Sequence, residues 1–207
     1  MILESGSGSS MVTGDNNTVS GAAVRDGYVG ISGTGNTVTV GDGSYAEDWG
    51  IGNTITIGAN GRFQGHGAGS TVYATHGGDD LMLRGSGEIA YANDDTIELG
   101  SDLATVSGNN NQISTMGLSG GAQTLNLGGS NNTVTLDRGL QVVTSLGSVS
   151  ESEDGTVVLN GGVVPGGATL TGGVLSVQLG NGNVATLSGV SSGTQIEYVD
   201  ATGAASW

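Results

Sequence analysis

Short runs of alternating polar and apolar residues recur along the chain. In the run NTVTV at 36–40 threonine alternates with valine, and similar runs begin at Asn53 and Asn132. Because successive side chains of a β-strand point to opposite faces, each run places its threonines on one face and its aliphatic side chains on the other. The pattern predicts many short strands that are buried on one side only, and no segment has the 3.6-residue period of a helix.

Glycine, asparagine or aspartate flanks each run, and these residues favour the left-handed backbone of sharp corners. The first four copies begin at Gly14, Gly33, Gly50 and Gly67, so they are nearly evenly spaced. Similar runs at a near-constant spacing favour successive turns of one coil over antiparallel hairpins. The sequence therefore predicts an all-β fold, a single-domain parallel β-solenoid with short strands and Gly/Asn/Asp corners. We expect on the order of ten to twelve turns at the strand spacing of about 4.8 Å.

The copies divide the single domain, 1–207, into three parts. Regular repeats occupy 1–138, an irregular excursion occupies 139–155, and 156–207 contains looser repeats and a distinct C-terminal segment. The stretch SYAEDWG at 44–50 is expected to leave the coil as a loop, with Trp49 folding back as a cover.

Asparagine recurs at the corners, where stacked side-chain amides can form hydrogen-bonded ladders through their donor and acceptor groups. The predicted ladder positions are Asn17, Asn36, Asn53, Asn111 and Asn132.

Composition and charge narrow the choice of partners. The chain has 42 glycines in 207 residues but no three-residue glycine period, which excludes collagen. Its net charge of -15 makes nucleic acid and anionic membranes poor partners and divalent cations good ones. No apolar stretch is long enough to insert into a membrane. The chain has no cysteine, and the start MILESGSGSSMV lacks the features of a signal peptide.

Two segments carry a family resemblance. At GGDDLMLRG, from Gly77, and ANDDTIELG, from Ala92, the chain resembles degenerate RTX repeats, the glycine- and aspartate-rich repeats of bacterial proteins exported by type I secretion. The end of the chain is similar to the segment that commonly follows such repeats, with matches at Gly189-Val190, Ile196-Glu197, Tyr198, Asp200 and Trp207. The resemblance implies an extracellular or cell-surface protein of a bacterium, exported without an N-terminal signal peptide.

The resemblance also implies calcium. A full RTX repeat presents a calcium-binding aspartate on every turn, whereas most matching corners here carry asparagine. We therefore expect a local Ca²⁺ site at Asp79, Asp80, Asp94 and Asp95, where stacked carboxylates could share one ion. The alternative is that these aspartates are solvated and merely favour turns. We interpret His66 and His76 as two unrelated loop histidines.

Threonines in the repeats could form flat outward rows, as in solenoids that resemble ice-binding proteins. The candidates for such a face are Thr37, Thr39, Thr54, Thr56, Thr133 and Thr135. The alternative is that threonine is simply a good β-former on a solvated face. We do not expect an enzyme, because the chain lacks lysine and its histidines and arginines are scattered; a carbohydrate-active β-helix enzyme is the remote alternative.

The ends of a solenoid expose unpaired backbone unless a cap covers them. No capping helix is evident at residues 1–15 or 195–207, so we expect head-to-tail association of the chain with itself. The sequence thus favours a structural or adhesive protein of a bacterial surface or biofilm matrix that forms filaments and contacts a cell surface or polysaccharide. A calcium-dependent or ice-binding adhesin module is the alternative.

Overall fold

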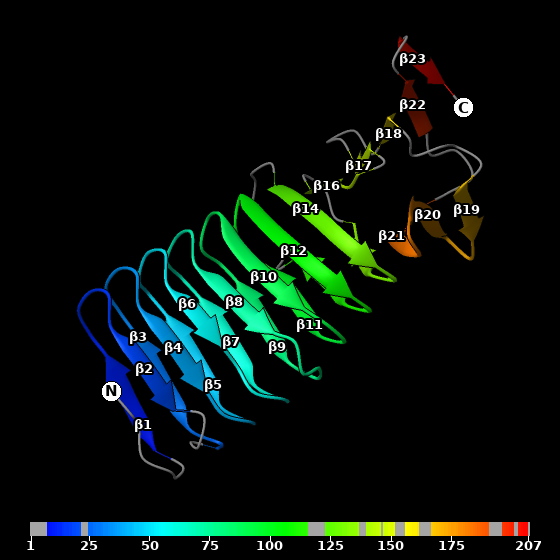
Figure 1. Ribbon diagram of the computed structural model, residues 1–207. Helices are drawn as coiled ribbons and strands as arrows, with labels where there is room; N and C mark the ends of the chain where they lie inside the picture. Colours follow the sequence, from blue (N-terminus) through cyan, green and yellow to red (C-terminus); the bar gives the residue numbers. More distant parts are fainter. Residues whose placement is uncertain are drawn as a thin grey trace.

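The computed structural model shows a rod made almost entirely of β-strands (Figure 1). It describes residues 8–21, 25–115, 123–136, 140–145, 147–151, 156–161, 167–190, 196–200 and 203–206. The chain winds as a parallel β-solenoid of about 7 turns in a single domain, and this confirms the predicted fold class. Each turn contributes one strand to each of two facing sheets, which we call sheet A and sheet B.

The strands of sheet A, in spatial order, are β2 (Thr18–Gly21), β4 (Thr37–Val40), β6 (Thr54–Thr56), β8 (Thr71–Ala74), β10 (Glu88–Ala92), β12 (Leu103–Asn109), β14 (Gln123–Ser130), β16 (Leu140–Val143), β17 (Gly147–Glu151), β18 (Val157–Gly161), β22 (Ile196–Asp200) and β23 (Gly203–Ser206). Those of sheet B are β1 (Ser9–Val12), β3 (Tyr28–Ile31), β5 (Tyr45–Asp48), β7 (Arg62–Gly65), β9 (Asp80–Leu83), β11 (Thr96–Leu99), β13 (Gln112–Thr115), β15 (Thr133–Thr135), β21 (Asn183–Ser188), β20 (Val174–Gly180) and β19 (Ala168–Thr171).

The expected number of turns was too high because the parallel coil ends near β16 and does not continue through the rest of the chain. The first four copies of the repeat all lie in sheet A, at β2, β4, β6 and β8. The copies that begin at Gly77 and Ala92 supply β9 and β11 of sheet B. A turn therefore contains a strand that resembles the repeat and a second strand that often does not, and the spacing of the first four copies is the length of one turn.

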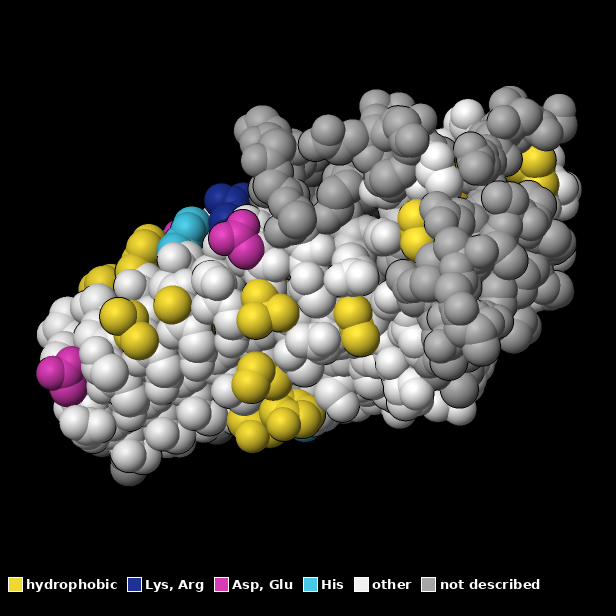
Figure 2. Space-filling model, turned by 90° about the horizontal axis from the view of Figure 1, so that it is seen from above, with side chains coloured by type: hydrophobic (Ala, Val, Ile, Leu, Met, Phe, Trp, Pro, Cys, Tyr) yellow, Lys and Arg dark blue, Asp and Glu magenta, His cyan; other side chains and the backbone are white. Residues whose placement is uncertain are grey.

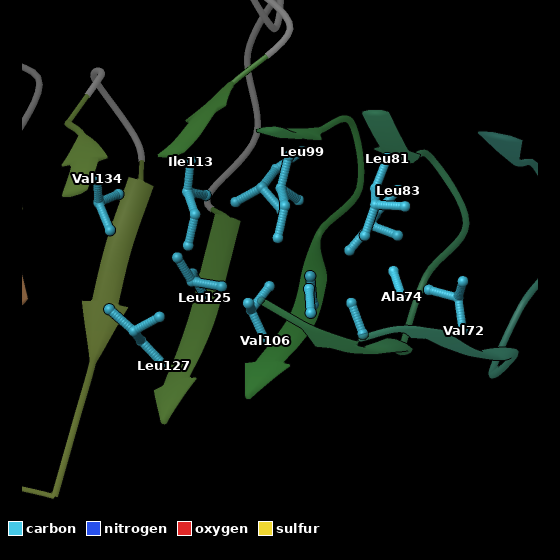
Figure 3. Close-up of a cluster of buried hydrophobic side chains, with 14 of the residues drawn as sticks. Val72, Ala74, Leu81, Leu83, Leu99, Val106, Ile113, Leu125, Leu127 and Val134 are labelled. Carbon is cyan, nitrogen blue, oxygen red and sulfur yellow. The ribbon is translucent and has the colours of Figure 1, made fainter. Parts of the chain in front are cut away.

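The core lies between the two sheets, where the inward positions of successive turns are stacked in register. Figure 3 shows Leu81, Leu83 and Leu99 of sheet B facing Val72 and Val106 of sheet A. In sheet B, Phe63 pairs with Leu81 and Leu81 with Ile97, so one interior column contains only apolar side chains. All of these side chains are buried. The burial of alternate residues on every turn supplies the main stabilising free energy.

The corners are tight and follow one local pattern. The residue before each inward polar corner residue has a left-handed backbone, as at Gly52 (φ 61°) and Asn110 (φ 60°). Two residues before the left-handed residue, glycines of successive turns lie directly against one another. A side chain on Gly67 would collide with the carbonyl oxygen of Gly50. Glycine is required there because the backbones of neighbouring turns approach too closely for a Cβ atom.

The segment 44–50 does not leave the coil, so the sequence-based expectation of a loop was wrong. Tyr45–Asp48 forms β5 and pairs in parallel with β3 and β7. Tyr45 and Glu47 point outward while Ala46 and Asp48 are buried, which is the alternation of any other strand in the rod. The sequence did not reveal this alternation because the inward position of Asp48 holds a charged residue and not an apolar one.

The parallel coil ends near β16. This strand pairs in parallel with β14, but β17 then returns antiparallel to β16 and β18 antiparallel to β17. In sheet B, β21 pairs in parallel with β15 and is followed in space by the antiparallel strands β20 and β19. The two ends of the rod therefore differ in strand direction. Among the described residues, no helix is long and apolar enough to span a membrane.

Candidate functional site

Asn17, Asn36 and Asn53 occupy the corner that precedes sheet A on three successive turns. The Oδ1 atom of Asn36 accepts a hydrogen bond from the backbone N–H of Asn17 (2.9 Å), and that of Asn53 accepts one from the N–H of Asn36 (2.7 Å). The Nδ2 groups of Asn36 and Asn53 donate to carbonyls of the preceding turn, at Gly14 (2.8 Å) and Gly33 (3.3 Å). Each amide therefore links neighbouring turns with both of its terminal atoms.

Asn111 and Asn132 belong to a second ladder at the opposite corner, before sheet B. The N–H of Asn111 donates to Oδ1 of Asn132 (2.9 Å), and the N–H of Asn132 donates to Oδ1 of Asn183 (2.8 Å). Their Nδ2 groups again donate to the preceding turn, at Ala92 (2.8 Å) and Gly108 (2.9 Å). The five ladder asparagines singled out in the sequence thus form two columns, and Asn183, which was overlooked, extends the second.

Asp79 and Asp95 take the same inward position in this second column. The N–H of Asp79 donates to Oδ1 of Asp95 (2.8 Å), and the N–H of Asp95 donates to Oδ1 of Asn111 (3.1 Å). An ionised carboxylate cannot supply the donor that an asparagine amide supplies. Oδ2 of Asp79 is buried and has no hydrogen-bond partner among the described residues. Burial raises the pKa of Asp79, and it raises the pKa of Asp95 to about 6.

Asp80 and Asp94 point elsewhere. Asp80 lies on the outer face of β9, 3.6 Å from the guanidinium of Arg62, and Asp94 is exposed at a left-handed corner (φ 59°). The four candidate calcium ligands are therefore divided between the interior column and the surface. Within the described part of the chain, no three His, Cys, Asp or Glu side chains converge into a group that could hold a metal ion. Calcium binding stays a prediction.

Glu88 is a further acidic residue in the first column, and the sequence did not single it out. It is 1% exposed, and its Oε2 accepts a hydrogen bond from the N–H of Gly85 (2.9 Å). Its Oε1 lies against Gly65, where the absence of a side chain leaves room, and has no hydrogen-bond partner among the described residues. Burial, reinforced by the nearby charge of Asp48 and opposed by the Gly85 bond, raises the pKa of Glu88 to about 8.

The predicted threonine face is divided between the two sheets. Thr37, Thr39, Thr54 and Thr56 lie on the outer face of sheet A, whereas Thr133 and Thr135 lie on the outer face of sheet B. On sheet A one row contains Thr18, Thr37, Thr54 and Thr71 in direct register, and the next contains Ser20, Thr39 and Thr56. Sheet A therefore presents two parallel rows of hydroxyl-bearing side chains over its first turns.

The outer face of sheet B has a different character. The carboxylate of Glu47 accepts a hydrogen bond from the hydroxyl of Tyr28 (3.0 Å) and lies 3.0 Å from Nε2 of His66. The ring of His66 stacks on that of Trp49, with centroids 5.9 Å apart and planes 4° apart. The Tyr45 hydroxyl donates to Oε1 of Gln64 (2.8 Å). His66 therefore belongs to an outward cluster of aromatic and polar side chains and is not an isolated loop residue.

Sequence reasoning missed this cluster because its members do not belong to the repeated phrase. Tyr28 and Tyr45 are partners in the pairing of β3 with β5, and Tyr45 and Arg62 are partners in that of β5 with β7. Aligning the sequence on the period of a complete turn, and not on the phrase, would have placed these side chains in one row. Of the C-terminal positions matched to the secretion segment, Gly189 and Val190 are described, with Val190 buried. The other matches lie in β22, of which only the backbone is described, except Trp207, which lies outside the described residues.

Comparisons with protein-family models, with curated proteins and with solved structures give no match. The proposed function therefore depends on the sequence and on the geometry of the described residues.

Replacing Asp79 with asparagine should stabilise the rod. The new Nδ2 group would supply the donor toward the preceding turn that the other ladder amides supply, and we expect the free energy of unfolding in urea to rise by about 1 kcal/mol in calcium-free buffer. The matched control is Asp94→Asn, which removes the same charge at an exposed corner and should change stability by less than about 0.5 kcal/mol. A loss of stability in Asp79→Asn in this buffer would contradict the assignment of Asp79 to the ladder.

The buried Glu88 should make stability depend on pH. Its pKa in the folded chain is about 8, above the ordinary 4.5, so its favourable contribution is complete below about pH 4.5 and is lost as the pH rises through 8. We expect the free energy of unfolding in urea to fall by a few kcal/mol between pH 5 and pH 9. Glu88→Gln should flatten this decline, while Glu98→Gln on the outer face should not. Equal pH profiles for the wild type and Glu88→Gln would contradict the assignment.

Proposed function

We propose that this chain is an extracellular structural or adhesive protein of a bacterial surface or matrix, a stiff rod that associates end to end. The observation that carries the proposal is the open edge of the first turn. Among the described residues, β1 pairs only with β3 and β2 pairs only with β4. Unpaired strand edges are templates for another chain.

The open edge also exposes the end of an amide ladder. Oδ1 of Asn36 accepts from the turn before it, and the equivalent atom of Asn17 has no donor among the described residues. A further turn supplied by another molecule could donate to it. Because most strand pairs at the opposite end of the rod are antiparallel, a contact between unlike ends would be heterologous, and heterologous contacts that do not close produce filaments.

The proposed location depends on the RTX resemblance and on composition. Type I secretion would account for an acidic, cysteine-free coil with glycine- and aspartate-rich corners, and these features support the proposal. Calcium binding belongs to the same proposal: Asp79 and Asp95 lie on adjacent turns, and the buried Oδ2 of Asp79 has no hydrogen-bond partner among the described residues, so a bound cation would supply its missing partner. Binding to a cell surface or to a polysaccharide requires no catalytic group, so the proposal includes no enzymatic activity.

Blocking the open edge should prevent assembly. The N–H of Tyr28 donates to the carbonyl of Gly8 (2.9 Å) and that of Thr37 to the carbonyl of Asn17 (2.8 Å), so the alternation of a parallel ladder directs the N–H groups of Ser9 and Ser20 outward. Ser9→Pro with Ser20→Pro removes both donors without removing an internal bond. We expect filaments of uniform width for the wild type in negative-stain electron microscopy and single rods for the double variant.

The control is Ser9→Ala with Ser20→Ala, which retains both N–H groups and should assemble like the wild type. Each protein is imaged in millimolar Ca²⁺ and in chelator, and its cooperative unfolding is checked. Loss of filaments in chelator would place calcium in the assembly. Single rods for the wild type in both conditions would exclude self-assembly.

A second candidate is ice binding, which the two registered hydroxyl rows on sheet A favour. Thr37 and Thr54 pair directly, and so do Thr39 and Thr56. Neighbouring strands are about 4.8 Å apart, so the hydroxyls and methyls form a regular flat array. This array covers only the first turns, because Tyr73 and Tyr91 follow in the second row with their rings stacked 5.0 Å apart.

Thermal hysteresis measurements test this candidate. Thr37→Tyr with Thr54→Tyr should abolish hysteresis, because bulky rings interrupt the array, and tyrosine already occupies outward positions on this sheet. Thr133→Tyr, on the outer face of sheet B, is the matched control and should leave hysteresis unchanged. Absence of hysteresis in the wild type, or equal loss in the control, would exclude ice binding through sheet A.

A further inference from the structure

Positive charge is scarce in this chain, and two of its four arginines lie close together on one face. Against 19 acidic residues the chain has four arginines, no lysine and two histidines. Arg62, His66 and Arg84 all lie on the outer face of sheet B, at β7 and at the end of β9. In the face shown in Figure 2, dark blue arginine side chains lie beside a cyan histidine and near magenta carboxylates.

Two of these cations converge on a poor acceptor. One Nη atom of Arg62 lies 3.3 Å from Sδ of Met82, and one of Arg84 lies 3.7 Å from the same sulfur. A thioether is a weak hydrogen-bond acceptor and carries no charge to neutralise a guanidinium. Arg62 has one carboxylate partner, Asp80, at 3.6 Å, and no ion pair of Arg84 is found among the described residues. Two like charges around a neutral sulfur are only partly compensated.

The surrounding side chains hold Arg62 in place. The guanidinium of Arg62 lies over the ring of Tyr45, 5.4 Å from its centroid, and the Tyr45 hydroxyl is fixed by Gln64. Because Gln64 accepts this bond through Oε1, its Nε2 group retains two donors. Tyr45, Arg62 and Gln64 belong to strands of a packed sheet, and such elements position a site more accurately than loops do.

We propose that Arg62 and Arg84 bind an oxyanion, namely the carboxylate or sulfate group of a sugar unit in an acidic polysaccharide. Guanidinium groups match the geometry of such anions through paired N–H donors. The Nε2 group of Gln64 adds a neutral donor for a sugar hydroxyl, and Trp49, which is 45% exposed, provides an apolar edge nearby. The choice of a polysaccharide rests on the proposed matrix function, whereas the anion follows from the two arginines.

The net charge sets the conditions for the test. The other carboxylates of the chain repel a polyanion at long range, but about 0.15 M salt limits that repulsion to roughly 8 Å. The full chain is titrated calorimetrically at this ionic strength with an oligomer of uronic acid, with a neutral glucose oligomer and with sodium sulfate. Chelator is present so that calcium cannot bridge two carboxylates.

We expect the uronic acid oligomer to bind and the neutral oligomer not to bind. Arg84→Gln should weaken binding at least tenfold, and Arg84→Lys should retain part of the affinity. Arg25→Gln is the matched control: it removes the same charge from an arginine that lies 3.0 Å from Asp42 at a corner, and it should bind like the wild type.

Three results would overturn the proposal: no binding of the uronic acid oligomer at millimolar concentration, equal binding of the neutral oligomer, or equal weakening by Arg25→Gln. Sulfate that binds as tightly as the uronic acid oligomer would overturn the assignment of a saccharide ligand, although it would support an anion site. Filament formation is measured separately, so failure of this site and failure of end-to-end assembly are distinguishable.

Discussion

The corner ladder is the interaction on which the rest of the structure depends. Every turn must close at the height at which the next begins, and the backbone groups of a corner have no strand partner within the sheets. The side-chain amides of Asn36 and Asn132 satisfy these groups because each accepts a hydrogen bond from a backbone N–H of the preceding turn and donates one to a backbone carbonyl of that turn. The glycine column beside them allows the backbones to approach. Short strands of three to eight residues are sufficient only because the corners are fixed in this way.

In the middle of the rod, acidic residues occupy ladder positions that asparagine occupies elsewhere, and burying their carboxylates is energetically unfavourable. Asp79, Glu88 and Asp95 lie on adjacent turns, and each has a buried carboxyl whose pKa is raised by desolvation. A carboxyl that is protonated resembles an amide more closely than a carboxylate does, since it can donate a hydrogen bond. These turns are therefore more sensitive to protons and cations than the asparagine turns on either side of them.

The sequence predicted the solenoid because alternation and corner chemistry are both local properties. Val38 and Thr39 reveal their faces by position alone, and the asparagines reveal the corners. It did not predict that one turn contains two strands, since the phrase marks only one corner at a time. Nor could it assign Asp79 to the interior and Asp80 to the surface, because that difference depends on which residue closes the corner. The arginine cluster was missed for a further reason: Arg62 and Arg84 become neighbours only when turns of unequal length are aligned.

The division between interior and surface also locates function. Inward and corner positions are constrained by packing and by the ladder, whereas outward positions of the strands are free to vary. The two outer faces carry different side chains. Sheet A presents hydroxyl rows near Thr37 and Thr54, and sheet B presents Arg62, His66 and Arg84 beside aromatic rings. Repeating one side chain along the rod produces a uniform surface, which suits an extended partner. A pair of arginines on two adjacent turns suits a discrete ligand group. Sheet B is therefore the face on which specific recognition is to be sought, and the ends of the rod are where assembly is to be sought.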